Sequence, residues 1–182
     1  MDRDRLLTRA IVEERAGKRP AVDLTDPART TVSSAGLDLS GFTAIEDSAA
    51  AFLSGLEGTL NLGGLQSLSR AEAEALAGHR GSLLLDGLET LSGAAALALA
   101  GHMGAVSLNG LQSLTEDTAE ALASHRGYLA LNGVRTLPEG AAVALSRYRG
   151  PHLTLDSLEV RTLSPMALEC LRSCPSIDWE TT

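Results

Sequence analysis

A repeat of 23 residues constrains the fold of this chain more than any other feature of its sequence. The pattern is leucine, any residue, leucine, a small residue, glycine and an apolar residue, and its copies begin at Leu37, Leu60, Leu83, Val106 and Leu129. A related segment begins one residue late at Leu153, after the extra Pro151-His152, and residues 177–179 match a truncated seventh unit. One unit of this length cannot bury its own apolar face, so we expect stacked units that share a core.

Each unit divides into an expected strand, a turn and a helix. The two leucines of the L-x-L segment share one side of a strand, because successive side chains alternate. The glycine that follows is expected to turn the chain with a positive φ, at Gly41, Gly64, Gly87, Gly110 and Gly133. Residues that favour helix starts then share one position, at Ser69, Ser92, Thr115 and Pro138. Ser69 and Glu72 have the spacing of a capping box.

The expected helix carries a face of alanine and leucine. One column contains Ala50, Ala73, Ala96, Ala119 and Ala142. A second column lies three residues later and contains Leu53, Leu76, Leu99, Leu122 and Leu145. That spacing forms a single helical stripe, whose small alanines allow close packing. A last column of glycines is expected to end the helices as C′ residues, at Gly58, Gly81, Gly104, Gly127 and Gly150.

This unit resembles the leucine-rich-repeat family, in the Ala-rich form common in bacterial arrays. The resemblance runs from Leu37 to about Trp179. The usual family unit has an Asn three residues after L-x-L, where this chain has Phe42, Leu65, Leu88, Leu111, Val134 and Leu158. Other contacts are therefore expected to stabilise the turn. The resemblance implies an α/β solenoid similar to leucine-rich repeats, with short parallel strands on one face and helices on the other.

The two ends of the chain depart from the repeat. We expect residues 1–36 to form an N-terminal cap or arm, 37–160 the repeats, and 161–182 a C-terminal helix and cap. Leu6, Leu7, Ala10 and Ile11 indicate a short amphipathic helix, which either caps the first repeat or docks on a partner. Ser164-Pro165 is expected to open the last helix, and Trp179 to cover the end of the stack.

Composition and charge argue against several classes of function. The chain has 15 Lys and Arg against 23 Asp and Glu, a net charge of −8, which opposes binding to nucleic acid. No apolar run reaches the roughly 18 residues of a membrane span. Near Met1 the apolar stretch is broken by Arg9, Glu13 and Glu14, so no signal peptide is expected. These features predict a cytoplasmic protein.

The titratable residues do not form a catalytic pattern. The motifs G-x-S-x-G, G-x-x-x-x-G-K and H-E-x-x-H are absent, so we predict no catalytic residue, no metal and no cofactor. Cys170 and Cys174 are interpreted as free thiols, with a redox pair or half a metal site as alternatives. One column contains Leu56, His79, His102, His125 and Tyr148. It is interpreted as structural, because the outer two histidines would lie about 10 Å apart, too far to share one ion.

The side of the expected sheet that faces away from the helices is the candidate binding surface, and we call it the sheet face. Its first column, just before L-x-L, contains Gly36, Thr59, Ser82, Ala105, Tyr128, His152 and Ser176. The second, within L-x-L, contains Asp38, Asn61, Leu84, Ser107, Ala130, Thr154 and Asp178. The third, just after it, contains Ser40, Gly63, Asp86, Asn109, Asn132 and Asp156.

An apolar spot with a polar rim is expected on this face. The spot comprises Leu84, Ala105, Tyr128 and Ala130, and the rim comprises Asp86, Asn109, Asn132 and His152. Tyrosine is enriched at protein interfaces. Together with the family resemblance, this predicts a non-enzymatic module that binds a protein partner and is monomeric or weakly self-associating. The alternatives are a self-assembling structural repeat protein and a regulatory or targeting subunit of a separate enzyme.

Overall fold

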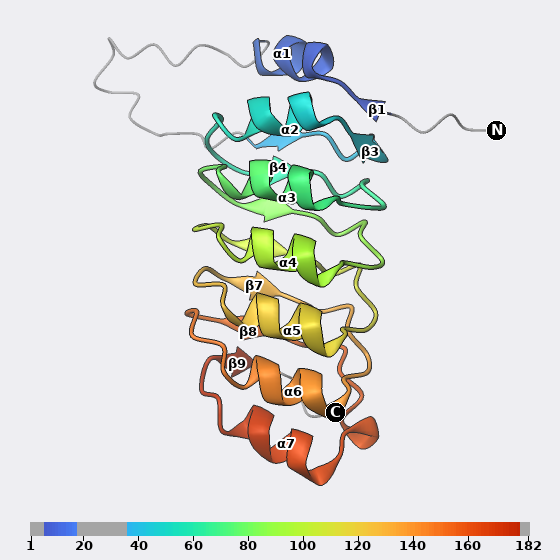
Figure 1. Ribbon diagram of the computed structural model, residues 1–182, viewed down its shortest axis with the longest axis vertical. Coiled ribbons are helices and arrows are strands. Elements are labelled where there is room, and N and C mark those ends of the chain that lie inside the picture. The colour runs from blue at the N-terminus through green and yellow to red at the C-terminus, as the bar shows by residue number, and fades with distance from the viewer. Residues whose placement is uncertain (1–5, 18–35, 179–182) are drawn as a thin grey trace, which may run out of the picture.

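The protein has an α/β fold in which short parallel strands alternate with helices along the chain. A computed structural model describes residues 6–17 and 36–178. Figure 1 shows the strand–helix units following one another along the long axis, with α1 at one end and α7 at the other. The repeat in the sequence is therefore a repeat in the structure.

Seven strands of two residues each form one parallel sheet. They are β2 (Leu37–Asp38), β4 (Leu60–Asn61), β5 (Leu83–Leu84), β6 (Val106–Ser107), β7 (Leu129–Ala130), β8 (Leu153–Thr154) and β9 (Ile177–Asp178). They pair in this order, and each L-x-L segment lies in register with the next, as Leu60 with Leu83 and Leu83 with Val106. The 23-residue period thus places equivalent residues side by side.

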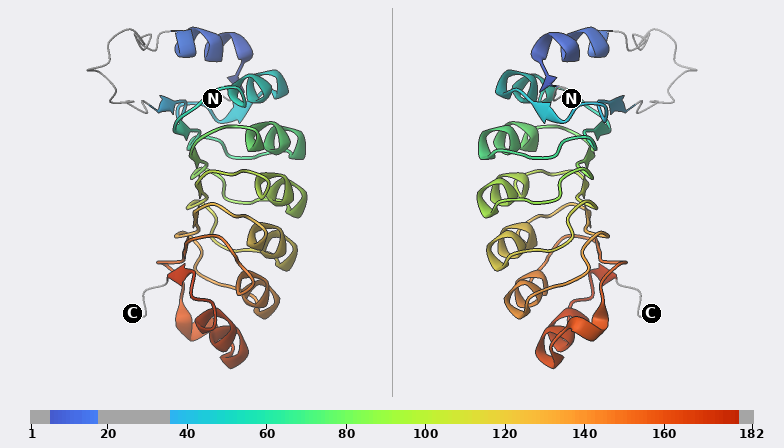
Figure 2. Two further views of the ribbon diagram at one scale, coloured as in Figure 1. Left: turned by 90° about the vertical axis from the view of Figure 1, so that its left-hand side faces the viewer. Right: turned by 90° about the vertical axis from the view of Figure 1, so that its right-hand side faces the viewer.

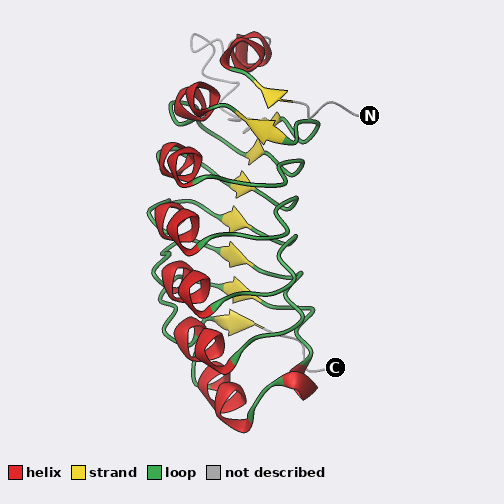
Figure 3. Cartoon of the chain, turned by 45° about the vertical axis from the view of Figure 1, so that its right-hand side comes forward, coloured by secondary structure: helices red, strands yellow, loops and turns green. Residues whose placement is uncertain are grey.

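The helices lie on one side of this sheet. They are α2 (Asp47–Leu53), α3 (Arg70–Ala77), α4 (Gly93–Leu99), α5 (Glu116–Ala123), α6 (Glu139–Leu145) and α7 (Pro165–Arg172). A short 3-10 helix, η2 (Val160–Thr162), precedes α7. Each helix packs against its neighbour in the next unit. Figure 2 shows the stack from its two edges as a gentle arc, and Figure 3 shows the strands on the side away from the helices.

The core between the two layers consists of leucine and alanine. The leucines of L-x-L are buried, as are the apolar residues that follow each turn, such as Leu65 and Leu111. The two expected helix columns are buried as well, for example Ala73 and Leu76 in α3. Because each unit contributes the same side chains, one continuous core runs along the stack.

The helix starts follow the sequence. Ser69 accepts a hydrogen bond from the Glu72 backbone N–H, and Glu72 in turn accepts one from the Ser69 N–H, which completes the capping box. Ser92, Thr115 and Ser164 cap α4, α5 and α7 through their hydroxyl oxygens. Pro138 occupies the N-cap position of α6, where it has no side-chain cap to offer.

The expectation of positive φ at the turn glycines is wrong. Among the described residues only Gly58 and Gly81 have positive φ, and neither is a turn glycine. The turns are closed by hydrogen bonds such as that from the Leu65 N–H to the Leu62 carbonyl, at 3.0 Å. A Cβ at Gly133 would lie 1.9 Å from the Asn109 carbonyl oxygen of the preceding unit. Glycine is therefore required by the close approach of neighbouring units.

The expectation that the second glycine column ends the helices is also wrong. The helices end several residues earlier, with right-handed caps at Ser54, Gly78, Ala100, Ser124 and Ser146. The glycines lie in the loop that leads to the next strand, where they stack on one another. A Cβ at Gly104 would lie 1.9 Å from the Gly81 carbonyl oxygen.

The N-terminal segment adds a short strand and a helix to the first unit. β1 (Leu6–Leu7) pairs in parallel with β3 (Ala44–Ile45), and α1 (Arg9–Gly17) packs against α2. Leu6 and Leu7 thus lie in a strand, in contrast to the helix expected from the sequence. Leu7 and Val12 are the buried side chains of this segment. Trp179, expected to cover the far end, lies outside the described residues.

Candidate interaction surface

The sheet face is the outer surface of the seven-stranded sheet, and its side chains alternate as expected. In each of these strands the described L-x-L leucines or their equivalents are buried, while the residue that follows the first of them is partly or fully exposed. Thr59, Ser82, Ala105 and His152 of the first column are partly exposed, and Tyr128 is 57% exposed. Figure 3 shows that no described helix covers this side of the sheet.

A polar ladder connects the units at the carboxyl ends of the strands. The Asp86 Oδ1 accepts hydrogen bonds from the Ser107 hydroxyl at 2.5 Å and from the Asn109 backbone N–H at 2.9 Å. The Asn109 side chain donates to Ser107 at 2.9 Å, and its Oδ1 accepts from the Asn132 N–H at 2.9 Å. The Asn132 Oδ1 accepts from the Asp156 N–H at 3.5 Å. These five residues, which we call the polar ladder, are held in place across four units.

The first two units use side chains of the second column instead, and each hydrogen bond stays within its own unit. The Asp38 Oδ1 accepts from the Ser40 N–H, and the Asn61 Oδ1 accepts from the Gly63 N–H, each at 3.0 Å within its own unit. The Ser40 hydrogen bonds, with a smaller contribution from the charge of Arg15, hold the pKa of Asp38 below its ordinary value. Side chains around L-x-L therefore stabilise the turns, and no Asn three residues later is needed.

Tyr128 lies within a small cluster near the C-terminal end of the sheet face. Its ring is 6.0 Å from the His152 ring, centroid to centroid, in a tilted arrangement. The His152 Nε2 is 3.1 Å from the Asp178 Oδ2. Register places these three residues on the adjacent strands β7, β8 and β9 or just before them. The result is an exposed aromatic ring beside an imidazole and a carboxylate.

The expected apolar spot is interrupted. Ser107 pairs with Leu84 on one side and with Ala130 on the other, so it separates these two apolar side chains. Ala105 adjoins Tyr128, whose carbonyl accepts the Val106 N–H. The structure thus brings Asp86, Asn109 and Asn132 together in the ladder and Tyr128 together with His152. Sequence reasoning did not single out Ser107, Asp156 or Asp178, although their columns identified them as exposed.

The histidine column lies in the loops that follow α3, α4 and α5. His79, His102 and His125 are buried, and neighbouring rings stack at 6.3 Å and 6.4 Å between centroids. The His79 Nε2 is 2.7 Å from the Gly58 carbonyl, and the His102 Nε2 is 2.8 Å from the Gly81 carbonyl. Tyr148, at the equivalent position, donates to the Gly127 carbonyl. His79, His102 and Tyr148 therefore join their units to the preceding ones by hydrogen bonds, whereas the ring nitrogens of His125 have no hydrogen-bond partner among the described residues and its ring contacts the preceding unit by stacking on His102.

Burial favours the neutral form of two of these imidazoles, His102 and His125. It lowers the pKa of His102, and it lowers the pKa of His125, which the neighbouring His102 depresses further. A neutral imidazole has a single N–H. Consequently His102 can donate to only one of its two facing carbonyls, those of Ala77 and Gly81.

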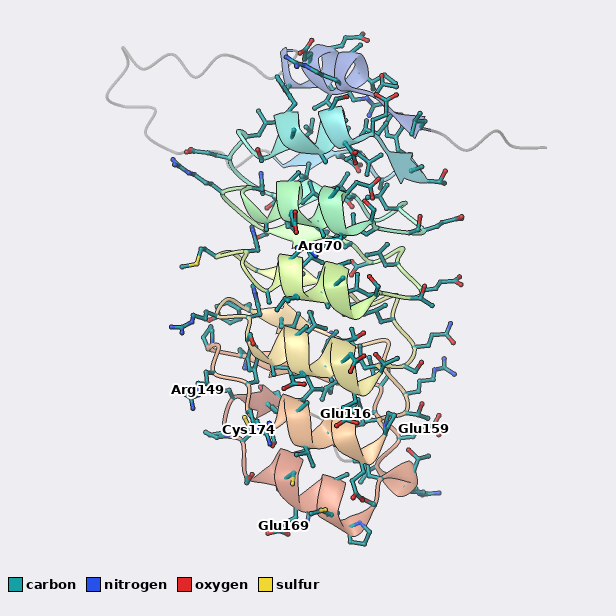
Figure 4. All side chains as sticks on the ribbon, viewed as in Figure 1. Arg70, Glu116, Arg149, Glu159, Glu169 and Cys174 are labelled. Carbon is teal, nitrogen blue, oxygen red and sulfur yellow. The ribbon has the colours of Figure 1, made fainter. Side chains whose placement is uncertain are left out.

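The remaining candidates lie away from the sheet face. Within the described residues no group of three or more His, Cys, Asp or Glu side chains is arranged to hold a metal ion. Cys170 and Cys174 are free thiols of α7 and its C-terminal loop. A hollow of about 290 Å³ between α5 and α6 is lined by Glu120, Ser124 and the arginines Arg126, Arg147 and Arg149. Figure 4 shows Arg149 at one edge of the stack and Glu159 at the other edge.

Comparison with known proteins does not assign a function to this surface. Neither a model of a known protein family nor a curated protein matches the chain. None of the helices that the structure describes has the length and apolar character needed to cross a bilayer.

Proposed function

We propose that this chain is a non-enzymatic protein–protein interaction module, a solenoid similar to leucine-rich repeats that binds its partner through the sheet face. One observation carries the proposal: the sheet face is left open by all described elements, and the polar ladder holds its side chains in fixed positions. A surface ordered before binding loses little conformational entropy in the complex.

The size of the surface supports this proposal. Seven strands at ~4.8 Å spacing give a sheet about 29 Å long. With the flanking loops, this is enough for a standard interface of ~800 Å² per partner. The resemblance of the 23-residue unit to leucine-rich repeats supports the same choice of face. We further infer a cytoplasmic location, which the two free thiols suit.

Affinity capture from the source cells, read by mass spectrometry, tests the proposal. The native chain is compared with a Leu84→Arg, Tyr128→Ala variant, which changes only the sheet face. The matched control is Leu97→Arg, because Leu97 is 64% exposed on α4, on the opposite side of the molecule. Circular dichroism first establishes that both variants keep the native spectrum.

The proposal predicts a partner that the native chain and Leu97→Arg capture and the sheet-face variant loses. A partner lost only by Leu97→Arg would move the site to the helix side. Failure to capture a partner, together with a mass that rises with concentration, would favour self-assembly. Activity in the purified chain that depends on a polar surface residue would contradict the non-enzymatic assignment.

A further inference from the structure

The charge of the sheet face has one sign. Its aspartates are Asp38, Asp86, Asp156 and Asp178, and all four are exposed. Lys and Arg are absent from the described positions of its three columns. Arg126, Arg147 and Arg149, which form no ion pair with another described residue, lie instead around the hollow between α5 and α6. A surface of this kind repels nucleic acid and anionic lipid and attracts cations.

Three of these carboxylates retain the capacity to bind a cation. The Asp86 Oδ1 is engaged in the polar ladder, but its second oxygen makes no hydrogen bond within the described chain. The Asp156 carboxylate has no hydrogen bond or ion pair among the described residues, since only its backbone N–H joins the ladder. Asp178 is 70% exposed beside His152, a group that carries charge only when protonated.

Tyr128 adds a second kind of cation-binding group to the same surface. Its ring is more than half exposed, and the His152 ring supports it at 6.0 Å. Guanidinium and ammonium groups bind over the face of an aromatic ring within about 6 Å of its centroid. Tyr128 precedes β7, whereas Asn132, the residue of the same unit that shares a column with Asp86 and Asp156, follows four residues later, roughly 13 Å away along the strand. A cation bound over Tyr128 would therefore lie at the amino ends of the strands, beside His152 and its neighbour Asp178.

The spacing of the carboxylates fits an extended chain. Asp86 and Asp156 occupy equivalent positions after β5 and β8, which are three strand intervals apart. At ~4.8 Å per interval their separation is roughly 14 Å. An extended peptide advances ~3.3 Å per residue, so residues four apart span about the same distance and point to the same side.

We propose that the sheet face binds an extended basic segment of a partner protein, whose Arg or Lys side chains four residues apart contact Asp86 and Asp156 at the carboxyl ends of the strands, while a separate cationic group of the same partner binds over Tyr128 at their amino ends. This inference rests on the proposed function, because it names the chemistry of the partner for the same surface. The segment runs along the stack, across the strands, and leaves the polar ladder intact.

Binding of synthetic peptides to the full chain tests this proposal by fluorescence anisotropy. The probe is a labelled Ser/Thr peptide with two Arg residues at positions i and i+4. Two comparison peptides have Glu at both positions or the two Arg adjacent to each other. We expect the i, i+4 Arg peptide to bind most tightly and the Glu peptide not to bind. Raising the salt concentration from about 50 mM to about 300 mM should weaken the binding of the Arg peptide.

Charge-neutralising variants then locate the contact. Asp86→Asn and Asp156→Asn are each expected to weaken the Arg peptide about two- to fivefold, the range of an exposed ion pair. Asn retains the acceptor oxygen that Asp86 supplies to the ladder. The matched control is Glu169→Gln, which changes the net charge equally on α7, where Figure 4 shows Glu169. It should leave binding unchanged.

Equal binding of the Arg and Glu peptides, or no binding of either, would overturn the basic-segment proposal. An equal loss of affinity in Glu169→Gln and the Asp variants would overturn it as well, since only overall charge would then matter. Neither result would contradict the proposed function, because that proposal is tested separately by whether the Leu84→Arg, Tyr128→Ala variant loses a captured partner. A partner lost by that variant without any preference for Arg peptides would retain the module and reject this ligand.

Discussion

Individual glycines in this protein are required by their neighbours across the unit boundary. Gly64, Gly87, Gly110 and Gly133 all have negative or extended φ, which any residue adopts. A Cβ at each of them would nevertheless lie within 2.4 Å of a carbonyl oxygen in the preceding unit. The side chain is therefore excluded by the distance between units, since backbone atoms of two turns occupy its space.

Replacing Gly133 by Ala should consequently destabilise the protein. The new Cβ would meet the Asn109 carbonyl, and overpacking of this kind typically costs roughly 1–3 kcal/mol of unfolding free energy. Gly55→Ala is the control, because the nearest atom to its Cβ would be 3.6 Å away and its φ is not positive. Urea unfolding should show a lower midpoint for Gly133→Ala alone. Equal midpoints for both variants would contradict the close-approach account.

Single residues of the polar ladder should contribute measurably to the free energy of unfolding. Asn109→Ala removes the hydrogen bonds that its side chain makes to Ser107 and to the Asn132 N–H. We expect a loss of about 1–2 kcal/mol in unfolding free energy. Gln112→Ala, at an exposed position of the following loop, should change it by less than about 0.5 kcal/mol. Chemical denaturation measures the unfolding free energy of the two variants. Equal values would mean that the ladder does not contribute to stability.

Between elements, the histidine column makes stability depend on pH. Burial depresses the pKa of His102 and His125 in the folded state, so the unfolded chain binds protons more readily. Their contribution is complete above the ordinary imidazole pKa of about 6.5 and is lost as the pH falls below it. The denaturation midpoint should therefore be lower at about pH 5.5 than at about pH 7.5.

A double variant isolates the source of this effect. His102→Leu, His125→Leu places in the column the residue that the first unit already has there, Leu56. Its midpoint should change less between the same two pH values than that of the native chain. The account is wrong if the native midpoint is independent of pH, or if the variant retains the full dependence.

At the scale of the whole molecule, the period of the sequence predicts the topology. A spacing of 23 residues between L-x-L segments places Leu60, Leu83 and Val106 side by side, and the structure has that register. Helix starts at Ser69, Ser92 and Thr115 were predictable for the same reason, because a hydroxyl cap is a local contact. The contacts between neighbouring units were not predictable from the sequence. The role of the glycines depends on a neighbour 23 or 24 positions away, which a local turn rule does not consider.

The candidate surface was predictable in part. The alternation of L-x-L identifies which side chains face outward, and the structure confirms this for every strand. The sequence did not show that Ser107 divides Leu84 from Ala130, nor that Asp178 lies 3.1 Å from His152. Both depend on lateral neighbours in the sheet. β3 was not predicted, because the strand with which it pairs, β1, lies outside the repeat.

The most direct test of the central claim is site-specific photo-crosslinking in living cells. A benzophenone amino acid is placed at Tyr128 on the sheet face or at Leu97 on α4, both of which are exposed. If the sheet face is the binding surface, irradiation should give a discrete higher-mass adduct from position 128 and none from position 97. An adduct from position 97 alone would contradict the claim and place the interaction on the helices.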